Sequence, residues 1–339
     1  MNDTFLKACR GEKTAYTPVW LMRQAGRYLP EYRKVRSKVD FLTLCKTPEL
    51  AAEVTIQPVE ILKVDVAILF SDILIPVEAM GMKLEFSESK GPILYDPVRN
   101  DVAVSRLRSI KAKEDVPFVM DAVKLLVKKL NVPLIGFSGA PFTLATYMIE
   151  GGSSRNFINT KRMMYQTPEL FGKLMDKISD TVIDYLQAQI DAGANAVQIF
   201  DSWAGVLSPV DFEAYALPCV QKIVSALKGK VPVIYFAFNG SAMLKLVKKS
   251  GADIFGIDWR IDMADAIGML GSDVAVQGNL DPCTLFGPKD LIRDRVKGIL
   301  NRAEGAKGHI FNLGHGILPE TPVENAIAMV EAVHELSSR

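Results

Sequence analysis

The chain has 339 residues, 49% of them hydrophobic and 23% charged, so it can bury a large core, which argues against a disordered protein. Its formal net charge of +1 gives no global attraction to nucleic acid or to an anionic membrane, and we expect neither as a partner. No apolar run reaches the length of a membrane span and the first residues lack a signal core, which favours a cytoplasmic location. The four cysteines lie far apart, without a CxxC pair, as is typical of reduced thiols.

Eight short apolar runs predict eight β-strands, and most of them are separated by a segment with helical periodicity. In chain order the predicted strands are 18–22, 65–70, 132–138, 196–200, 231–238, 253–257, 274–278 and 308–313. The predicted helices between and after them are 48–62, 168–192, 209–227, 241–250, 263–270, 289–303 and 322–336. Because the strands are nearly continuous apolar runs, we expect parallel strands that are covered on both faces.

Eight strand–helix units predict an α/β fold, a single-domain (β/α)8 TIM barrel that spans residues 1–339. An open, doubly wound sheet is the main alternative. Such a sheet usually has a glycine-rich nucleotide loop after its first strand, where this chain has Arg23-Gln24-Ala25-Gly26-Arg27. We therefore favour the barrel, whose active-site cleft lies at the carboxyl ends of the strands.

Positive charge follows the first predicted strand. Arg23 comes directly after the strand and Arg27 four residues later, so both are expected near the mouth of the barrel. Guanidinium groups at such a site favour planar anions such as carboxylate or phosphate. We favour anion binding for these two arginines, and we interpret the basic residues between positions 33 and 38 as surface charges.

Other strand ends carry weaker signals. Asp72 follows the second strand, and its position leaves open whether it is a counterion of the arginines or a partner of the substrate. His315 lies between two glycines that give room for a ligand, although a lone loop histidine is more often structural. Tyr147 could be a core aromatic, and Ser202 could cap a turn.

Several reaction classes lack their motifs. No GxSxG elbow surrounds a serine and no Walker loop is present. The cysteines and histidines lack zinc-ligand spacing, in particular a His-x-Cys pair, so no metal site is expected. We interpret His309 as a packing residue at the start of a strand and His334 as an exposed residue of the last helix.

Five segments, distributed over essentially the whole chain, resemble the uroporphyrinogen decarboxylase family. The two long signatures are Trp20-Leu21-Met22-Arg23-Gln24-Ala25-Gly26-Arg27-Tyr28-Leu29-Pro30 and Gly136-Phe137-Ser138-Gly139-Ala140-Pro141-Phe142-Thr143 through Tyr147 to Gly152. The three short ones are Phe70-Ser71-Asp72, Phe200-Asp201-Ser202-Trp203-Ala204-Gly205 and Asn312-Leu313-Gly314-His315-Gly316.

The resemblance implies a lyase of porphyrin and heme biosynthesis, usually a homodimer. It implies conversion of uroporphyrinogen III to coproporphyrinogen III by loss of four acetate carboxyl groups as carbon dioxide, without a cofactor. By motif position, the family's substrate contacts fall on Arg23, Arg27, Asp72, Tyr147, Ser202 and His315. Of these, Asp72, Arg23 and Arg27 are expected to take part in catalysis, whereas the proton donor stays open between the arginines and His315.

Two functions other than decarboxylation are compatible with parts of the sequence. A zinc-dependent methyltransferase of the same superfamily would need thiolate and histidine ligands, and the missing His-x-Cys pair counts against it. A non-catalytic porphyrinogen-binding protein could share the arginines but would not need a central carboxylate, whereas Asp72 is present.

Overall fold

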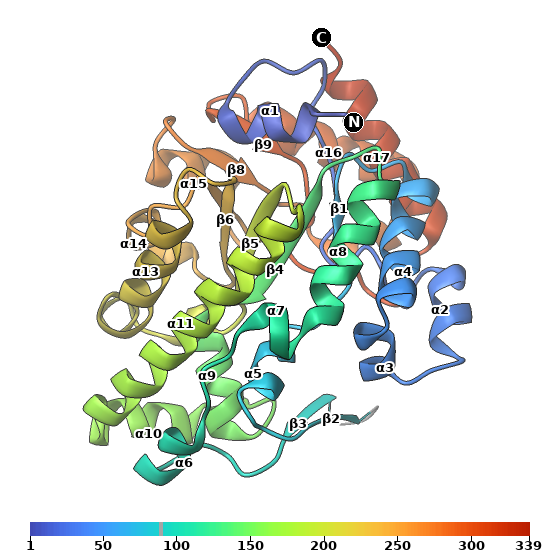
Figure 1. The fold of residues 1–339 in the computed structure, drawn as a ribbon. Helices are drawn as coiled ribbons and strands as arrows, with labels where there is room; N and C mark the ends of the chain where they lie inside the picture. The colour runs from blue at the N-terminus through green and yellow to red at the C-terminus, as the bar shows by residue number, and fades with distance from the viewer. Residues whose placement is uncertain (88–90) are drawn as a thin grey trace.

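A computed structural model describes residues 1–87 and 91–339, and a parallel sheet forms its centre (Figure 1). The seven strands of this sheet are β1 (Ala67–Ile68), β4 (Leu134–Gly139), β5 (Ala196–Asp201), β6 (Val233–Ala237), β7 (Ile254–Gly256), β8 (Ala275–Gln277) and β9 (Gly308–Ile310). Each strand pairs in parallel with the next in the order β1-β4-β5-β6-β7-β8-β9. Every one of them overlaps a predicted strand, and most of them are shorter than the prediction.

The remaining predicted strand, 18–22, closes the sheet through a single bridge. Val19 pairs in parallel with Phe311, just past β9, and the Phe311 amide donates to the Pro18 carbonyl at 2.8 Å. On its other side Val19 accepts from the Asp65 amide at 2.9 Å, and its own amide donates to the Asp65 carboxylate at 2.8 Å. The chain thus joins β9 to the segment that leads into β1, and the predicted (β/α)8 barrel is confirmed.

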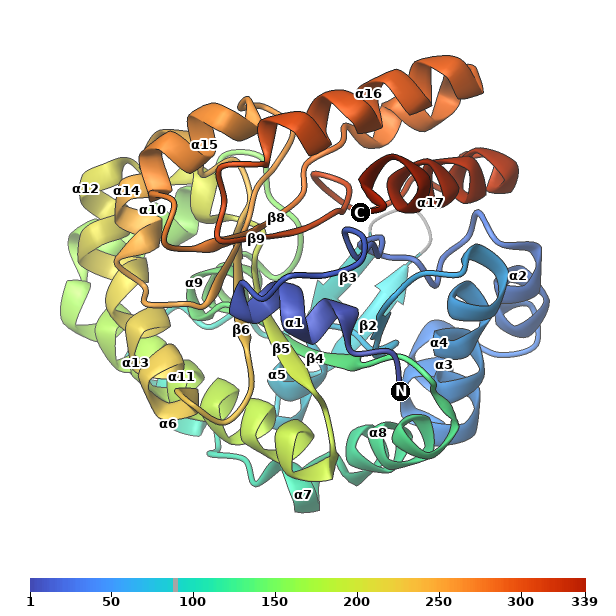
Figure 2. The ribbon, with the colours of Figure 1, turned by 90° about the horizontal axis from the view of Figure 1, so that it is seen from above.

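Helices surround this barrel (Figure 2). Before β4 they are α1 (Thr4–Arg10), α2 (Pro30–Arg36), α3 (Phe41–Lys46), α4 (Pro48–Leu62), α5 (Ile75–Ala79), α6 (Asp101–Arg106), α7 (Ala112–Asp115) and α8 (Pro117–Lys129). Between β4 and β6 they are α9 (Pro141–Glu150), α10 (Ile158–Gln166), α11 (Pro168–Ala192), η1 (Ala204–Val206), α12 (Pro209–Asp211), η2 (Phe212–Ala216) and α13 (Leu217–Leu227). After β6 they are η3 (Ser241–Met243), α14 (Leu244–Lys248), α15 (Met263–Leu270), η4 (Pro282–Phe286), α16 (Lys289–Arg302) and α17 (Val323–Ser337).

The predicted helices agree closely with these bounds, with one instructive difference. The predicted helix 209–227 is interrupted by the π-helical turn η2, in which the Leu217 amide donates to the Phe212 carbonyl. Pro218 lies at the start of α13 and has no amide hydrogen, and its ring would clash with the carbonyl four residues earlier in a regular helix. The wider turn just before Pro218 relieves this clash.

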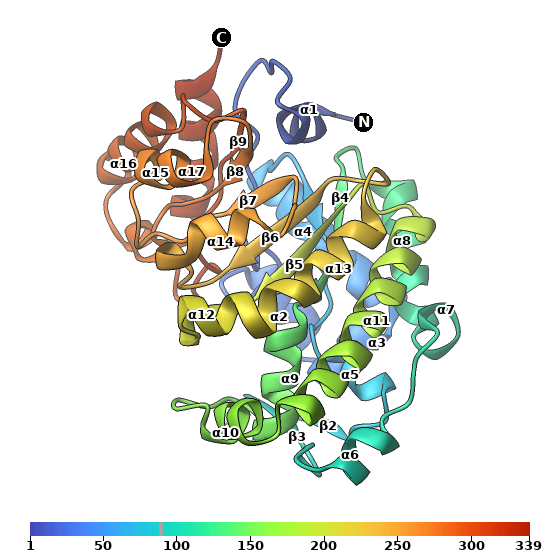
Figure 3. The same ribbon diagram turned by 90° about the vertical axis from the view of Figure 1, so that its left-hand side faces the viewer.

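The amino end of the barrel is covered by helix α1. Helix α1 lies across the amino ends of β8 and β9 (Figure 2), and a side chain at Gly308 would collide with the Ala8 carbonyl. In Figures 1 and 3 the termini lie at this end, while α6, α9, α10 and the hairpin of β2 (Leu84–Ser87) and β3 (Gly91–Leu94) lie at the opposite end. The sequence analysis did not predict this hairpin.

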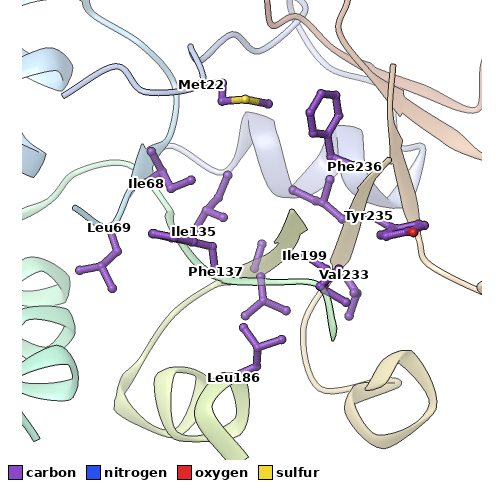
Figure 4. Close-up of a cluster of buried hydrophobic side chains, with 14 of the residues drawn as sticks. Met22, Ile68, Leu69, Ile135, Phe137, Leu186, Ile199, Val233, Tyr235 and Phe236 are labelled. Carbon is purple, nitrogen blue, oxygen red and sulfur yellow. The ribbon is translucent and has the colours of Figure 1, made fainter. Parts of the chain in front are cut away.

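The core continues from the barrel into the helical layer. Figure 4 shows part of it, where Ile135 of β4 and Ile199 of β5 are gathered with Leu186 of α11. Inside the barrel a short polar chain crosses the apolar filling, because Trp20 Nε1 donates to Gln277 Oε1 at 2.9 Å and Gln277 Nε2 donates to Gln198 Oε1 at 3.1 Å. This chain ties the closing segment 18–22 to the opposite side of the sheet.

Candidate active site

Arg23 begins the first loop at the carboxyl end of the barrel, and its backbone is strained. Its φ of 62° lies in the left-handed region, which a residue with a Cβ rarely adopts outside functional or tight turns. The side chain lies against Gly316, where any added Cβ would collide with Arg23 Cδ. The first and last loops of the barrel therefore meet here, and Gly316 provides the space for the arginine.

Asp72 lies just after β1, half-buried, and one of its oxygens accepts a hydrogen bond from the Leu74 amide at 2.8 Å. Burial raises the pKa of Asp72 from 3.8 to about 6, while the Leu74 amide and the charge of Arg23 act in the opposite direction. Within the described residues no ion pair joins Asp72 to an arginine at 4.0 Å or less. A carboxylate held as a simple counterion would have a lowered pKa, so burial outweighs the charge of Arg23 in setting the pKa of Asp72.

Tyr147, on α9, completes a group around Asp72. It is half-buried, and its pKa is raised by burial and, next, by the negative charge of Asp72. Its ring centroid lies 5.8 Å from that of Trp203, which follows β5. The phenol, the carboxylate and the Arg23 guanidinium are therefore within electrostatic reach of one another, although they come from three different strand ends.

His315 lies in the last loop and packs on an aromatic side chain. Its ring centroid is 4.4 Å from that of Phe238, which follows β6. Burial, together with the positive charges of Arg23 and Arg260, lowers the pKa of His315 from 6.5 to about 4. The imidazole is therefore neutral at pH 7 and can bind by hydrogen bonds, but it brings no positive charge of its own.

Arg27 and Ser202 lie at the edge of this group. The Arg27 side chain is exposed, its carbonyl accepts from Arg33 Nη1 at 3.3 Å, and its charge acts on Tyr32. Ser202 is half-buried and adjoins Trp203, the neighbour of Tyr147. The charge of Arg23 acts on Asp72, Tyr147 and His315, so these four residues lie within electrostatic range of that arginine. The other two predicted residues lie on loops at the same strand ends.

A buried carboxylate that sequence reasoning left without a role supports the loop after β5. Asp201 accepts hydrogen bonds from Thr143 Oγ1 at 2.6 Å and from the Tyr235 hydroxyl at 2.8 Å. Thr143 Oγ1 in turn accepts from the Trp203 amide at 3.1 Å. Burial raises the pKa of Asp201 to about 6. This network positions the backbone that carries Ser202 and Trp203.

The interpretation of His334 was wrong, and that of His309 was incomplete. His334 is half-buried because Nε2 contacts the buried Asp65 carboxylate at 2.7 Å and the ring packs on Tyr16 at 4.7 Å. The last helix had been expected to present this histidine to solvent, but it packs beside the closing segment of the barrel. His309 packs as predicted and also hydrogen-bonds the Gly278 carbonyl at 2.9 Å.

Other features of the described residues limit what the site can be. Among residues 1–87 and 91–339, no group of three His, Cys, Asp or Glu side chains is arranged to hold a metal ion. No helix there is long and apolar enough to cross a membrane. Two hollows of about 230 and 490 Å³ lie between outer helices, at α7 and α11 and at α4 and α8, away from the strand ends.

Comparison with known proteins identifies the family. The sequence model described as "Uroporphyrinogen decarboxylase (URO-D)" matches residues 1–336. A curated protein named "Uroporphyrinogen decarboxylase" from Carboxydothermus hydrogenoformans is 58% identical over all of this chain and 97% of its own length. A protein of the same name from Desulfotalea psychrophila is also 58% identical, over the whole of both chains.

Among solved structures, a methyltransferase from Methanosarcina mazei has the same fold. It has a TM-score of 0.79, with 21% identity and 98% of each chain covered, so the likeness concerns architecture alone. Together, the full-length sequence matches and the arrangement of loops at the barrel mouth show that the chain belongs to the uroporphyrinogen decarboxylase family.

Proposed function

We propose that the chain is a carboxy-lyase that converts uroporphyrinogen III to coproporphyrinogen III and carbon dioxide, with Arg23, Arg27 and Asp72 taking part in catalysis. The observation that carries this proposal is the state of Asp72. Its carboxylate is half-buried, has a raised pKa and lacks a direct ion pair within the described chain, although Arg23 lies close enough to act on its charge. Such a group is suited to bind N–H donors or a forming cation on the substrate.

The substrate has eight carboxylates on a flexible ring of four pyrrole N–H groups. Arg23 and Arg27 would bind acetate or propionate arms through charge-assisted hydrogen bonds, which are often bidentate for arginine. Tyr147, Ser202 and the neutral His315 would orient the arms by hydrogen bonding. The pyrrole N–H groups point inward in the folded macrocycle. Asp72 would accept hydrogen bonds from them with the carboxylate lone pairs that the Leu74 amide does not use.

The reaction needs a place for the electron pair of the broken bond. A proton adds to the pyrrole α-carbon next to the carbon that bears the acetate arm, and the ring becomes cationic with positive charge on the arm-bearing carbon. The bond to the carboxylate then breaks, its electrons neutralise the ring, and carbon dioxide leaves. A second proton converts the exocyclic methylene to a methyl group, and the ring carbon returns its proton, so one proton replaces each carbon dioxide. Asp72 lowers the barrier by stabilising the cationic ring.

The first proton must be delivered close to the arms. A free guanidinium is a poor acid near neutrality because its pKa is above about 12. His315 is neutral at pH 7 because its pKa is lowered to about 4, so it holds no proton to give in its resting state. We therefore propose that a proton from solvent, carried as hydronium, reaches the ring along water held between Arg23 and a substrate carboxylate, with the arginine as the positioning group.

The test is anaerobic incubation of the purified chain with uroporphyrinogen III, followed by chromatography of the oxidised products and measurement of carbon dioxide. We expect products with seven, six, five and finally four carboxyl groups. Tight binding of the substrate without carbon dioxide release would instead support a non-catalytic porphyrinogen-binding protein. Stoichiometric zinc in the purified chain, together with methyl transfer, would support the methyltransferase alternative.

We also propose that the chain is a homodimer in the cytoplasm. The dimer rests on the family resemblance, and the cytoplasmic location rests on the four widely separated cysteines, which are typical of reduced thiols. Light scattering on the purified protein should give twice the mass of the chain, at concentrations well below those used for crystallisation. A mass equal to that of one chain would refute the dimer.

A further inference from the structure

A third arginine, outside the family signatures quoted above, lies on the same face as the candidate site. Arg260 follows β7 in the segment Asp258-Trp259-Arg260, and so belongs to the loops at the carboxyl end of the barrel. Its guanidinium lies 3.9 Å from the ring centroid of Trp259 and 4.9 Å from that of Phe238. Phe238 is also the side chain on which His315 packs.

The loop that carries Arg260 is fixed by a buried carboxylate. Asp258 has a side chain that is 1% exposed and accepts the backbone amides of Asn239 and Arg260, each at 2.8 Å. A side chain at Gly314 would collide with the Trp259 amide, so the last loop packs closely on this one. The position of Arg260 relative to His315 is therefore set by backbone contacts on both sides.

The guanidinium itself has unused hydrogen-bonding capacity. Its Nη1 forms a long ion pair with Asp258 Oδ1 at 3.9 Å, which is beyond hydrogen-bonding distance, and the side chain is 43% exposed. In residues 1–87 and 91–339 no acceptor takes a hydrogen bond from it. Stacking on two aromatic rings orients the planar guanidinium group of Arg260 and leaves its N–H groups free to donate hydrogen bonds. An arginine in this state is prepared to bind a carboxylate.

We propose that Arg260 is a specificity-determining residue that binds a carboxylate arm of the substrate on the His315 side of the site. This inference rests on the proposed function, since that substrate has carboxylates around its whole rim. Arg260 and His315 both contact Phe238, and the charges of Arg23 and Arg260 both act on the imidazole, so each guanidinium lies within electrostatic range of it. His315 stays neutral, and the positive charge on this side of the site comes from the two arginines.

The experiment compares three variants in steady-state kinetics with uroporphyrinogen III. Arg260→Met removes the charge but keeps an unbranched stem on the aromatic rings, Arg260→Lys keeps the charge, and Arg295→Ala removes an exposed charge from the outer helix α16 as a control. We expect Arg260→Met to raise KM roughly five- to tenfold with kcat changed less than about twofold, since a hydrogen bond to a charged group is lost at a partly exposed site. Arg260→Lys should restore part of KM, and added salt should reduce the difference.

The outcomes are distinct. An unchanged KM in Arg260→Met, with an active wild type, overturns the assignment of Arg260 and leaves the proposed function intact. Equal changes of KM in Arg260→Met and Arg260→Lys, together with lower melting temperatures of both variants, would show a packing role for Arg260. That result would also overturn the assignment. A wild type that releases no carbon dioxide overturns the proposed function itself. Titration by NMR adds a check, because Arg260→Met should raise the pKa of His315 and leave that of His309 unchanged. If the pKa of His315 is the same in the variant and the wild type, the electrostatic basis of the inference is removed.

Discussion

Asp72→Asn is expected to make the protein more stable and much less active. In the folded protein the pKa of Asp72 is raised from 3.8 to about 6, which means that burial disfavours its ionised form. A shift of about two units corresponds to roughly 3 kcal/mol at pH 7, at 1.36 kcal/mol per unit. Asparagine has nearly the same shape and no charge, and its amide oxygen can still accept the Leu74 amide.

The sign of the pH dependence follows from the raised pKa. Below pH 3.8 the carboxyl is protonated in both the folded and the unfolded chain, so it contributes no difference. Between 3.8 and about 6 the folded chain takes up a proton that the unfolded chain has lost, so stability falls as pH rises through this window. The penalty is complete above about pH 6, and it is absent in Asp72→Asn.

Urea denaturation of both proteins at pH 7.5 and pH 4.5 measures this effect. We expect Asp72→Asn to be more stable by about 1–3 kcal/mol at pH 7.5, since relaxation of the site reduces the full penalty. The gain should fall to about a third of that value at pH 4.5. The difference between the two proteins cancels the titration of all other carboxyls. An Asn variant that is equally or less stable at pH 7.5 would refute the argument that this carboxylate is held ionised against its burial.

Activity should change in the opposite direction. Loss of one group that stabilises charge in a transition state typically lowers kcat by about 10²- to 10³-fold, and substrate binding should suffer much less. Carbon dioxide release under saturating uroporphyrinogen measures this. Near-normal turnover in Asp72→Asn would exclude the proposed role, whatever its effect on stability.

Three further outcomes are expected. The value of kcat/KM should fall as pH drops through about 6, because protonation of Asp72 removes the charge that the cation needs, and a flat profile between pH 5 and 7 would contradict this. Arg23→Ala and Arg27→Ala should raise KM and slow catalysis, whereas His315→Ala should have a milder effect in the same kinetics because its imidazole is neutral. Thr143→Val should destabilise the protein by about 1–3 kcal/mol in urea, and more at pH 8 than at pH 5, because it removes a hydrogen bond from ionised Asp201.

The barrel could be predicted from the sequence because its signal is repeated and local. Parallel strands covered on both faces are short apolar runs, and the helices between them have a clear apolar face. The predicted helices 48–62, 168–192 and 263–270 match α4, α11 and α15 from end to end. The predicted strand 18–22 is reduced to a single bridge in the structure, and no local signal in the sequence shows this. Its pairing with Phe311 depends on residues nearly three hundred positions away.

The site was predictable as a set of residues but not as an arrangement. The motifs named Arg23, Asp72, Tyr147 and His315, and in the structure the charge of Arg23 acts on the other three, but the spacing of the residues left the role of Asp72 open. Only the three-dimensional contacts show that Asp72 lacks a direct ion pair and is raised in pKa. Arg260 was missed because its signal is its position over Trp259 and Phe238 beside the His315 loop, and no stretch of sequence encodes that contact.

In the proposed mechanism, the raised pKa of Asp72 explains how one carboxylate would favour the transition state over the bound substrate. With a pKa of about 6 it is roughly nine-tenths ionised at pH 7, so the charge is present before the reaction begins. Burial makes that charge unfavourable in the resting site, and Arg23 only partly offsets it. A cation that forms on the substrate ring relieves this penalty in the transition state, whereas the uncharged ring of the bound substrate does not. Interactions that strengthen only in the transition state raise kcat, and a carboxylate already neutralised by a direct arginine pair would have little left to contribute.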